Sequence, residues 1–175
     1  MRMAVKRVEP GENAFLASLE AKAQQPNGFF RAMANRPDAL KAFVPFYSAV
    51  MGPGSVERRT KALLYRAVSI ANRCAFCIAA NTPYARKAGI TDEEMRALEA
   101  GEEGGFSAAE QAALSYARSL TRAGTASASE RDNLERLFTS EQIVELTLVI
   151  AMSNFTNRFN NGLNILPEGQ ESSGS

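Results

Sequence analysis

Two cysteines, Cys74 and Cys77, are the residues of this 175-residue chain whose type and spacing concentrate reactivity in one place. The chain contains no histidine, which excludes Ser-His-Asp triads, Cys-His dyads and histidine-ligated metals. Residues three apart on a helix have Cβ atoms about 5–6 Å apart, and a modest adjustment brings such a pair into disulfide geometry. The pair can therefore support dithiol and disulfide chemistry.

The residues around the pair favour a reactive thiol. A break at Asn72 and Arg73 predicts that Cys74 lies in the first turn of a helix, where the helix dipole favours a thiolate. The neighbouring Arg73 side chain adds positive charge, so we expect a cysteine pKa below the free value of about 8.5. A low-pKa thiol with a second thiol in reach can reduce a peroxide, because the sulfenic acid that forms condenses to a disulfide.

Other interpretations of the cysteine pair stay open. Buried cysteines can act simply as small hydrophobic side chains. A zinc site needs four ligands, and with two sulfurs and no imidazole only a cluster shared between two subunits could supply them, so we predict no metal and no other cofactor. A thioredoxin-like site needs a βαβ setting, which the helical pattern of this chain does not provide.

Composition and charge narrow the class of protein. The apolar fraction of 45% and the charged fraction of 22% are typical of a globular protein. Twenty basic and nineteen acidic residues leave a net charge of +1, which argues against nucleic acid or an anionic membrane as partner. The first ten residues are too polar for a signal peptide, and the apolar stretch 143–152 is far shorter than the ~20 residues of a membrane span. We predict a cytoplasmic protein, where a CxxC pair is more often redox-active or metal-binding than purely structural.

The local sequence signals along the chain are those that begin and end helices. Capping boxes are recognisable at Thr91…Glu94, Ser107…Glu110, Ser127…Glu130 and Thr139…Gln142. Apolar residues recur at helical spacing, and no segment shows sustained alternation of the kind expected for a strand. We expect helices over residues 12–25, 38–50, 55–72, 74–88, 92–100, 108–122, 128–138 and 140–163. The sequence therefore predicts an all-α, single-domain helical bundle over residues 1–166, followed by a disordered polar tail over residues 167–175.

A faint internal repeat suggests that the helical core is duplicated. A shift of 83 residues aligns Ala62 with Glu145 and sets Asn157 and Asn160 opposite the two cysteines. If this repeat is real, the second copy is a helical hairpin without thiols. Alternatively, the asparagines cap a helix end or form a polar contact between subunits.

The segment from Asn72 to Glu94, which includes Asn-Arg-Cys-Ala-Phe-Cys-Ile-Ala-Ala-Asn-Thr, resembles the alkylhydroperoxidase D-like branch of the carboxymuconolactone decarboxylase family. A weaker resemblance extends over roughly residues 30–165. It implies an all-α fold, a homo-oligomer and thiol-dependent reduction of alkyl hydroperoxides. It also implies that a dithiol partner returns the electrons, which in the best-known members is a lipoyl-bearing protein.

The chain departs from the pattern of that family at two positions. The family's peroxidases have a histidine four residues after the second cysteine, where this chain has Asn81, and a glutamate twelve residues before the first, where it has Ala62. Those two residues relay protons to and from the thiols. An asparagine can donate a hydrogen bond to a thiolate but cannot take its proton, so a contribution of typically about 10²–10⁴-fold is missing.

Two other side chains could compensate for the missing relay. Arg66, next to Tyr65 and one turn after Ala62, could stabilise a thiolate electrostatically. Glu145 lies on an otherwise apolar helix, where an unpaired carboxylate is costly, so it could pair with Arg66 or Arg158. Alternatively, Glu145 forms a buried ion pair without any catalytic role.

The leading hypothesis is a CxxC-dependent peroxidase in which Cys77 attacks the peroxide and Cys74 resolves the intermediate and faces the reductant. A redox sensor or small-molecule-binding oligomer of the same fold is the alternative. A lactone decarboxylase-type lyase fits less well, since such members rely on histidine and lack the cysteine pair. Subunit contact or core packing could each explain the aromatic residues near the N-terminus, Phe29, Phe30, Phe43, Phe46 and Tyr47.

Overall fold

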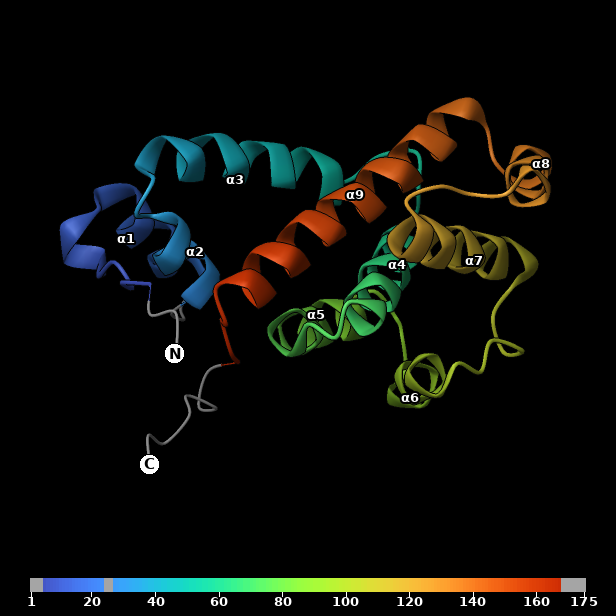
Figure 1. The fold of residues 1–175 in the computed structure, drawn as a ribbon, viewed down its shortest axis with the longest axis horizontal. Coiled ribbons are helices and arrows are strands. Elements are labelled where there is room, and N and C mark those ends of the chain that lie inside the picture. The colour runs from blue at the N-terminus through green and yellow to red at the C-terminus, as the bar shows by residue number, and fades with distance from the viewer. Residues whose placement is uncertain (1–4, 24–26, 168–175) are drawn as a thin grey trace.

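The computed structural model describes residues 5–23 and 27–167, and within these ranges the chain is all-α with no strand (Figure 1). The all-α expectation is confirmed, while the residues 168–175 of the expected tail lie outside the described ranges. The elements are a 3-10 turn, η1 (Pro10–Glu12), and the helices α1 (Ala14–Ala23), α2 (Gly28–Met33), α3 (Pro37–Met51), α4 (Arg58–Ala71), α5 (Ala75–Lys87), α6 (Asp92–Ala100), α7 (Ala108–Ala123), α8 (Ala128–Leu137) and α9 (Ser140–Gly162).

Local sequence signals set most helix boundaries. All four capping boxes are formed, at the N-termini of α6, α7, α8 and α9. Gly101 and Gly124 end α6 and α7 in the left-handed conformation, with φ of +77° and +73°, which a residue without Cβ adopts freely. The short helix α2 was not predicted, because six residues are too few for a periodic pattern to be recognised.

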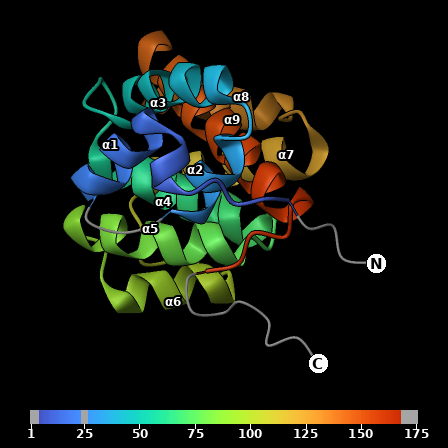
Figure 2. The same ribbon diagram turned by 90° about the vertical axis from the view of Figure 1, so that its left-hand side faces the viewer.

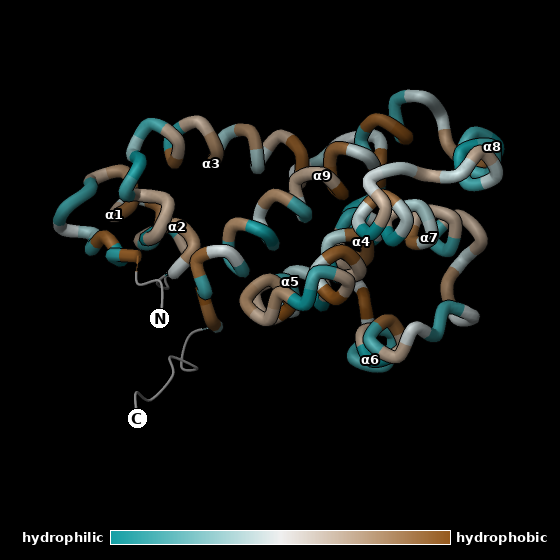
Figure 3. The backbone as a smooth tube through the Cα atoms, viewed as in Figure 1, coloured by the Kyte–Doolittle hydropathy of each residue, from teal (hydrophilic) through white to brown (hydrophobic). Residues whose placement is uncertain are grey.

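The long helix α9 is the central element of the fold. It runs diagonally through the molecule in Figure 1 and packs against α3, α4, α5, α7 and α8. In the view turned by 90°, α5 and α6 lie one below the other on the side away from α3 (Figure 2). Figure 3 shows that α9 is largely hydrophobic over its first half and becomes hydrophilic toward its C-terminal end. This change of character divides α9 into a core-forming part and a polar part.

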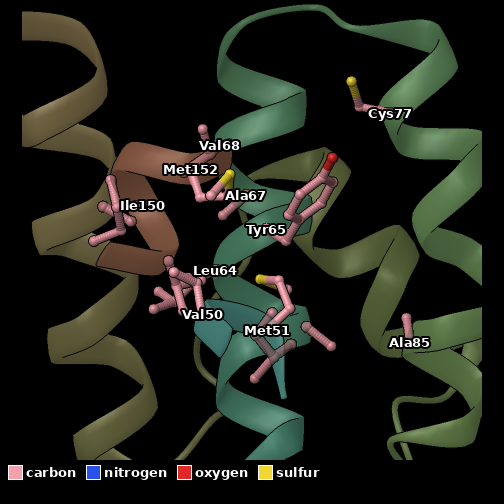
Figure 4. Close-up of a cluster of buried hydrophobic side chains, with 14 of the residues drawn as sticks. Val50, Met51, Leu64, Tyr65, Ala67, Val68, Cys77, Ala85, Ile150 and Met152 are labelled. Atoms are coloured by element: carbon pink, nitrogen blue, oxygen red, sulfur yellow. The ribbon is translucent and has the colours of Figure 1, made fainter. Parts of the chain in front are cut away.

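The apolar core lies where α4 and the first half of α9 meet α3 and α7. Leu64, Val68 and Ile150 are almost completely buried there, together with Val50 at the end of α3 (Figure 4). Burying a side chain of this size contributes roughly 1.5–3 kcal/mol. This packing fixes α4, and therefore the segment with the cysteines that follows it, relative to α9.

The predicted second helical hairpin is wrong. The internal repeat aligns the α4–α5 junction with the region around Asn157, but α9 runs unbroken from Ser140 to Gly162. No helix of the described part of the chain is long and apolar enough to cross a membrane.

Candidate active site

The cysteine pair lies at the junction of α4 and α5. Arg73 turns the chain there with a φ of +53°, a left-handed conformation that is uncommon for a residue with a side chain. Cys74 follows as the N-cap residue of α5, and its backbone N–H donates to the Ser69 carbonyl at 2.9 Å. Its Sγ accepts a hydrogen bond from the backbone N–H of Cys77 at 3.3 Å. Cys74 is thus one position before the expected first turn, and its sulfur still lies at the positive end of the helix dipole.

Cys74 and Cys77 form a disulfide, with their Cα atoms 5.3 Å apart. Their exposed fractions are 0% and 1%. The predicted reach of the two thiols is therefore confirmed. Both cysteines are buried in this disulfide form, and the roles of Cys77 as the attacking thiol and of Cys74 as the resolving thiol that faces the reductant stay predictions.

A side chain of α9 donates a hydrogen bond to the disulfide. Asn160 Nδ2 donates a hydrogen bond to Cys77 Sγ at 3.2 Å, and the residue is 1% exposed. Asn81, the residue expected beside the thiols, is also buried, but no hydrogen bond joins it to either sulfur in the described part of the chain. The Oδ1 atoms of Asn160 and Asn81 are both buried without a hydrogen-bond partner among the described residues. Such orphaned acceptors are rare in folded proteins.

A network of amide side chains ties α9 to the start of the cysteine segment. Asn72 Nδ2 donates to Oδ1 of Asn154 at 2.9 Å and of Asn157 at 3.0 Å. Asn157 in turn donates to the Ser69 hydroxyl at 3.1 Å. Asn154, Asn157 and Asn160 are buried, so the interpretation of these asparagines as helix caps is wrong for all three. Their role is to satisfy buried polar groups, which otherwise destabilise a fold.

A pocket of about 440 Å³ adjoins the disulfide. Its walls are mostly aromatic or apolar, with a few amide and hydroxyl groups, and they are formed by Asn27, Phe29, Phe30, Phe43, Tyr47, Tyr65, Phe76, Ala79, Ala80, Pro83, Thr156, Asn160 and Pro167. None of these described lining residues carries a charged side chain at neutral pH. Neither cysteine lines the pocket, but two lining residues adjoin the pair: Phe76 lies between the two cysteines in the sequence, and Asn160 donates to Cys77 Sγ.

The N-terminal aromatic residues have different environments. Phe29 and Phe43 are buried, and their rings lie 5.1 Å apart, whereas Phe46 is 55% exposed. Phe30 and Tyr47 line the pocket together with Phe29 and Phe43. Four of the five residues therefore form the pocket wall, and two of these four also belong to the buried core.

Tyr65 places a hydroxyl group at the pocket wall. Its OH group and the Thr156 Oγ1 are 2.9 Å apart, and Figure 4 shows the hydroxyl turned toward the side on which Cys77 lies. Burial raises the pKa of Tyr65 above its usual value of 10, and burial likewise raises the pKa of Tyr47. Both hydroxyls stay protonated at neutral pH, so they can donate hydrogen bonds but cannot act as proton-accepting bases there.

Neither of the two arginines expected near the thiols contacts the sulfurs. Arg66 pairs with Glu99 of α6 at 2.5 Å and donates to Thr82 of α5 at 3.3 Å, so its guanidinium bridges α4 to these helices. Arg73 is exposed. Both are close to the cysteines in sequence, but the buried Arg66 is turned toward Glu99 and Thr82, and Arg73 lies in the exposed turn between α4 and α5.

Glu145 does not lie at the disulfide. It precedes Asn160 by fifteen residues on α9, which corresponds to about 22 Å along the helix. Its carboxylate forms an ion pair with the buried Lys61 and accepts hydrogen bonds from the backbone N–H groups of Ser55 and Val56 at 2.7 and 3.0 Å. The expected pairing with Arg66 or Arg158 is therefore wrong, while the alternative of a structural ion pair fits. This interaction fixes the loop between α3 and α4 and explains why α4 begins at Arg58 instead of residue 55.

Nothing in the described part of the chain brings together three or more cysteine, aspartate or glutamate side chains in a way that could hold a metal ion.

A known protein family matches the part of the chain that contains the cysteine pair. The model of the carboxymuconolactone decarboxylase family matches residues 37–119, which include both cysteines. The uncharacterized protein YdfG of Bacillus subtilis (strain 168) is 35% identical over 107 residues, which cover 59% of this chain and 73% of YdfG.

Two solved structures show the extent of the shared fold. The debrominase Bmp8 has a TM-score of 0.82 at 19% identity, covering 94% of this chain and 92% of Bmp8. An uncharacterized peroxidase-related protein from Ralstonia eutropha JMP134, described as an alkylhydroperoxidase AhpD core, has a TM-score of 0.79 at 20% identity, covering 93% of this chain and 87% of its own. With the helical architecture and the cysteine pair in place, the chain belongs to the carboxymuconolactone decarboxylase family and has the AhpD-like fold.

Proposed function

We propose that the protein reduces organic hydroperoxides through a dithiol–disulfide cycle of Cys74 and Cys77, and that a dithiol recycles it. The observation that carries this proposal is the buried disulfide at the N-terminus of α5, contacted by Asn160 beside an uncharged pocket. The pocket can hold an organic molecule beside Asn160, which contacts Cys77 Sγ, and the helix dipole and the Asn160 amide both favour a thiolate. The peroxidase-related description of the Ralstonia eutropha protein is consistent with this chemistry.

The reaction begins at Cys77, whose sulfur is held by a residue of the pocket wall. The Cys77 thiolate attacks the terminal oxygen of the hydroperoxide, the O–O bond breaks, and the alkoxide leaves and takes a proton from water. Cys77 becomes a sulfenic acid. The Cys74 thiolate then attacks Cys77 Sγ, the S–O bond breaks, and hydroxide leaves as water after protonation. An external dithiol finally reduces the disulfide by exchange and becomes a disulfide itself.

The cycle runs without a histidine relay. Hydrogen bonding from Asn160 and the dipole of α5 stabilise the thiolate, but neither transfers a proton. We therefore expect a rate about 10²–10⁴-fold below that of a site with general acid–base catalysis. The ring hydroxyls near the pocket stay protonated, so they do not replace the missing base.

Multiple turnover tests the proposal. Reduced protein mixed with cumene hydroperoxide and an excess of dihydrolipoamide is expected to consume many equivalents of peroxide per subunit. The Cys74→Ser/Cys77→Ser double variant is expected to consume peroxide no faster than the dithiol alone. If the wild-type protein forms its disulfide once and then stops, although dihydrolipoamide restores both thiols, the protein is a redox sensor and the proposal is wrong.

Reductive debromination is a second candidate, favoured by the aromatic walls of the pocket. The debrominase Bmp8 shares the fold, and a cysteine-to-alanine variant of it has been crystallised with 2,3,4-tribromopyrrole. In this chain the two thiols would supply two electrons, so that a C–Br bond becomes C–H, bromide and a proton are released, and the disulfide forms. Bromide release from 2,3,4-tribromopyrrole in the same dithiol assay, without turnover of hydroperoxide, would favour this reaction over peroxide reduction.

A further inference from the structure

In the Asn160 carboxamide, the nitrogen has a hydrogen-bond partner but the oxygen has none among the described residues. Its Nδ2 donates to Cys77 Sγ at 3.2 Å, whereas its Oδ1 has no hydrogen-bond partner among the described residues although the side chain is buried. A buried acceptor without a partner is costly and calls for an explanation. Asn160 also lines the 440 Å³ pocket, so a ligand in this pocket is a suitable partner for the oxygen.

The two ends of this amide match the two reactants. A thiolate accepts hydrogen bonds more strongly than a disulfide sulfur, so the Nδ2 contact favours the ionised form of Cys77. The terminal oxygen of a hydroperoxide, which Cys77 attacks, carries the O–H donor, and Asn160 Oδ1 can accept that hydrogen bond. A single rigid side chain would then hold the sulfur and the peroxide group side by side, as efficient reaction requires.

The walls of the pocket indicate what the remainder of the substrate is. The described lining residues include several aromatic rings and no charged side chain, so a carboxylate or ammonium group would lose its hydration without gaining a partner. Pockets of this size accept small organic molecules. Hydrogen peroxide has no apolar body with which to occupy the aromatic surface, which disfavours it as the preferred substrate.

We propose that Asn160 is a positioning residue that holds both Cys77 and the peroxide group, and that the pocket selects uncharged, aryl-bearing or branched hydroperoxides. This inference rests on the proposed function for its chemistry. The binding of an unreactive ligand does not depend on turnover and can therefore be tested separately.

The first test measures the thiol. In a Cys74→Ser background, Asn160→Leu removes both polar ends of the side chain at similar volume and is expected to raise the pKa of Cys77 by about 1–2 units, measured as the pH dependence of alkylation. The matched control is Asn154→Leu. Asn154 is another buried amide of α9, but it bonds to Thr121 and Asn72 and not to sulfur. The control is expected to lose stability without the change in pKa, and equal pKa values in both variants would overturn the proposal.

The second test measures binding to the disulfide form by calorimetry. The alcohol 2-phenyl-2-propanol, the reduced product of cumene hydroperoxide, is expected to bind wild type at least tenfold more tightly than Asn160→Leu. Its para-carboxylate derivative is expected to bind tenfold or more weakly than the alcohol itself. If the alcohol binds in this way but no peroxide is turned over, the proposed function fails while this site assignment stands. Equal binding of the neutral and charged ligands contradicts the assignment.

An independent observation concerns the outer face of α9. From Glu141 to Arg158, the exposed positions of α9 are spaced by alternating steps of three and four residues, like the seam of a coiled coil. They are Glu141, Val144, Leu148, Ala151, Phe155 and Arg158. The four central residues are apolar, and Val144 and Phe155 are 60% and 50% exposed. Glu141 and Arg158, at the two ends, have no ion-pair partner among the described residues. We call these six residues the α9 seam.

The α9 seam is complementary to itself when reversed. A two-fold axis between Leu148 and Ala151 would set each of these residues against the other, Val144 against Phe155, and Glu141 against Arg158. Such a contact is isologous, so both copies use the same patch. The apolar centre is removed from water and the opposite charges meet at both ends, which selects the antiparallel direction. We infer that a second copy of this chain packs against the α9 seam.

Substitutions at the apolar centre and at the two charged ends of the α9 seam test this pairing. Leu148→Glu is expected to convert the dimer to a monomer in sedimentation velocity at micromolar concentration, while Leu137→Glu, at an equally exposed leucine of α8 (both 41%), is not. Glu141→Arg and Arg158→Glu are each expected to weaken the dimer several-fold at low salt, and the double exchange is expected to restore it. A monomeric wild type, or an unchanged assembly of Leu148→Glu, would overturn the inference.

Discussion

Replacing Cys77 by serine is expected to abolish the reaction with hydroperoxide, whereas replacing Cys74 is expected to leave one oxidation event per subunit. Cys77 is the sulfur that Asn160 contacts at the pocket, and Cys74 Sγ instead accepts from the backbone N–H of Cys77 at the start of α5. With Cys74→Ser and no added thiol, the sulfenic acid at Cys77 has no thiol to condense with, so it accumulates. With added dithiol, turnover should be lost in Cys77→Ser and should fall in Cys74→Ser, because the dithiol must then reach the buried sulfenic acid directly.

Trapping the intermediate distinguishes the two variants. A dimedone adduct detected by mass spectrometry is expected at Cys77 in the Cys74→Ser protein after one equivalent of cumene hydroperoxide. No adduct is expected at Cys74 in the Cys77→Ser protein. Serine closely matches cysteine in size, and the melting temperature of each reduced variant should be compared with that of reduced wild type. An adduct at Cys74 and none at Cys77 would reverse the assigned roles.

Removing the Glu145 carboxylate is expected to produce the largest loss of stability. Glu145→Leu leaves the ammonium group of Lys61 buried with only the carbonyl groups of Val50 and Gly52, at 3.0 and 2.6 Å. Breaking a buried ion pair on one side costs about 3–5 kcal/mol, and the backbone donors of Ser55 and Val56 lose their acceptor as well. The free energy of unfolding from urea denaturation measures this effect.

Two further substitutions locate the cause of that loss. Glu12→Leu removes the acidic partner of the exposed Lys6–Glu12 pair and is expected to leave the urea midpoint close to that of wild type, because surface pairs contribute little. Gly54→Ala is expected to mimic Glu145→Leu in part, since a methyl group at Gly54 would overlap the Glu145 carboxylate. A Glu145→Leu protein as stable as wild type would show that the ion pair does not hold the α3–α4 loop.

The same carboxylate gives the stability a definite dependence on pH. Burial by itself raises the pKa of Glu145, but hydrogen bonds from Lys61, Ser55 and Val56 outweigh it and hold that pKa below its ordinary value of 4.5. A group with a lowered pKa in the folded state stabilises the fold above its unfolded pKa. Its contribution is therefore present at neutral pH and is lost as the pH falls through the folded pKa, which lies below 4.5.

The helices of this fold can be predicted from the sequence because the residues that begin and end them are close together in the chain. Each capping box involves residues three apart, and the break at Asn72 and Arg73 correctly placed Cys74 at the start of a helix. The helix α2 escaped prediction because its six residues are too few to show a periodic pattern, although its N-cap Asn27 is itself a local signal and accepts from the backbone N–H groups of Phe29 and Phe30.

The site could be predicted only in part, because its polar residues are distant in sequence. Asn160 is 83 residues from Cys77, and no local pattern shows that the two are in contact. The repeat that set Asn160 opposite Cys77 hinted at this residue, although the duplicated hairpin it implied is absent. Buried asparagines at helical spacing on α9 were the available signal, since such amides require partners. Arg66 was misplaced because its partner, Glu99, lies on another helix.

The stoichiometry of a single oxidation tests the central claim most directly. Fully reduced protein is mixed with one equivalent of cumene hydroperoxide in the absence of any other thiol, and peroxide, alcohol and free thiols are counted. We predict that each subunit consumes one peroxide, releases one 2-phenyl-2-propanol and loses two thiols as the Cys74–Cys77 disulfide forms. Thiol loss without formation of the alcohol, or peroxide that persists beside reduced cysteines, would contradict the assignment of peroxide reduction to this cysteine pair.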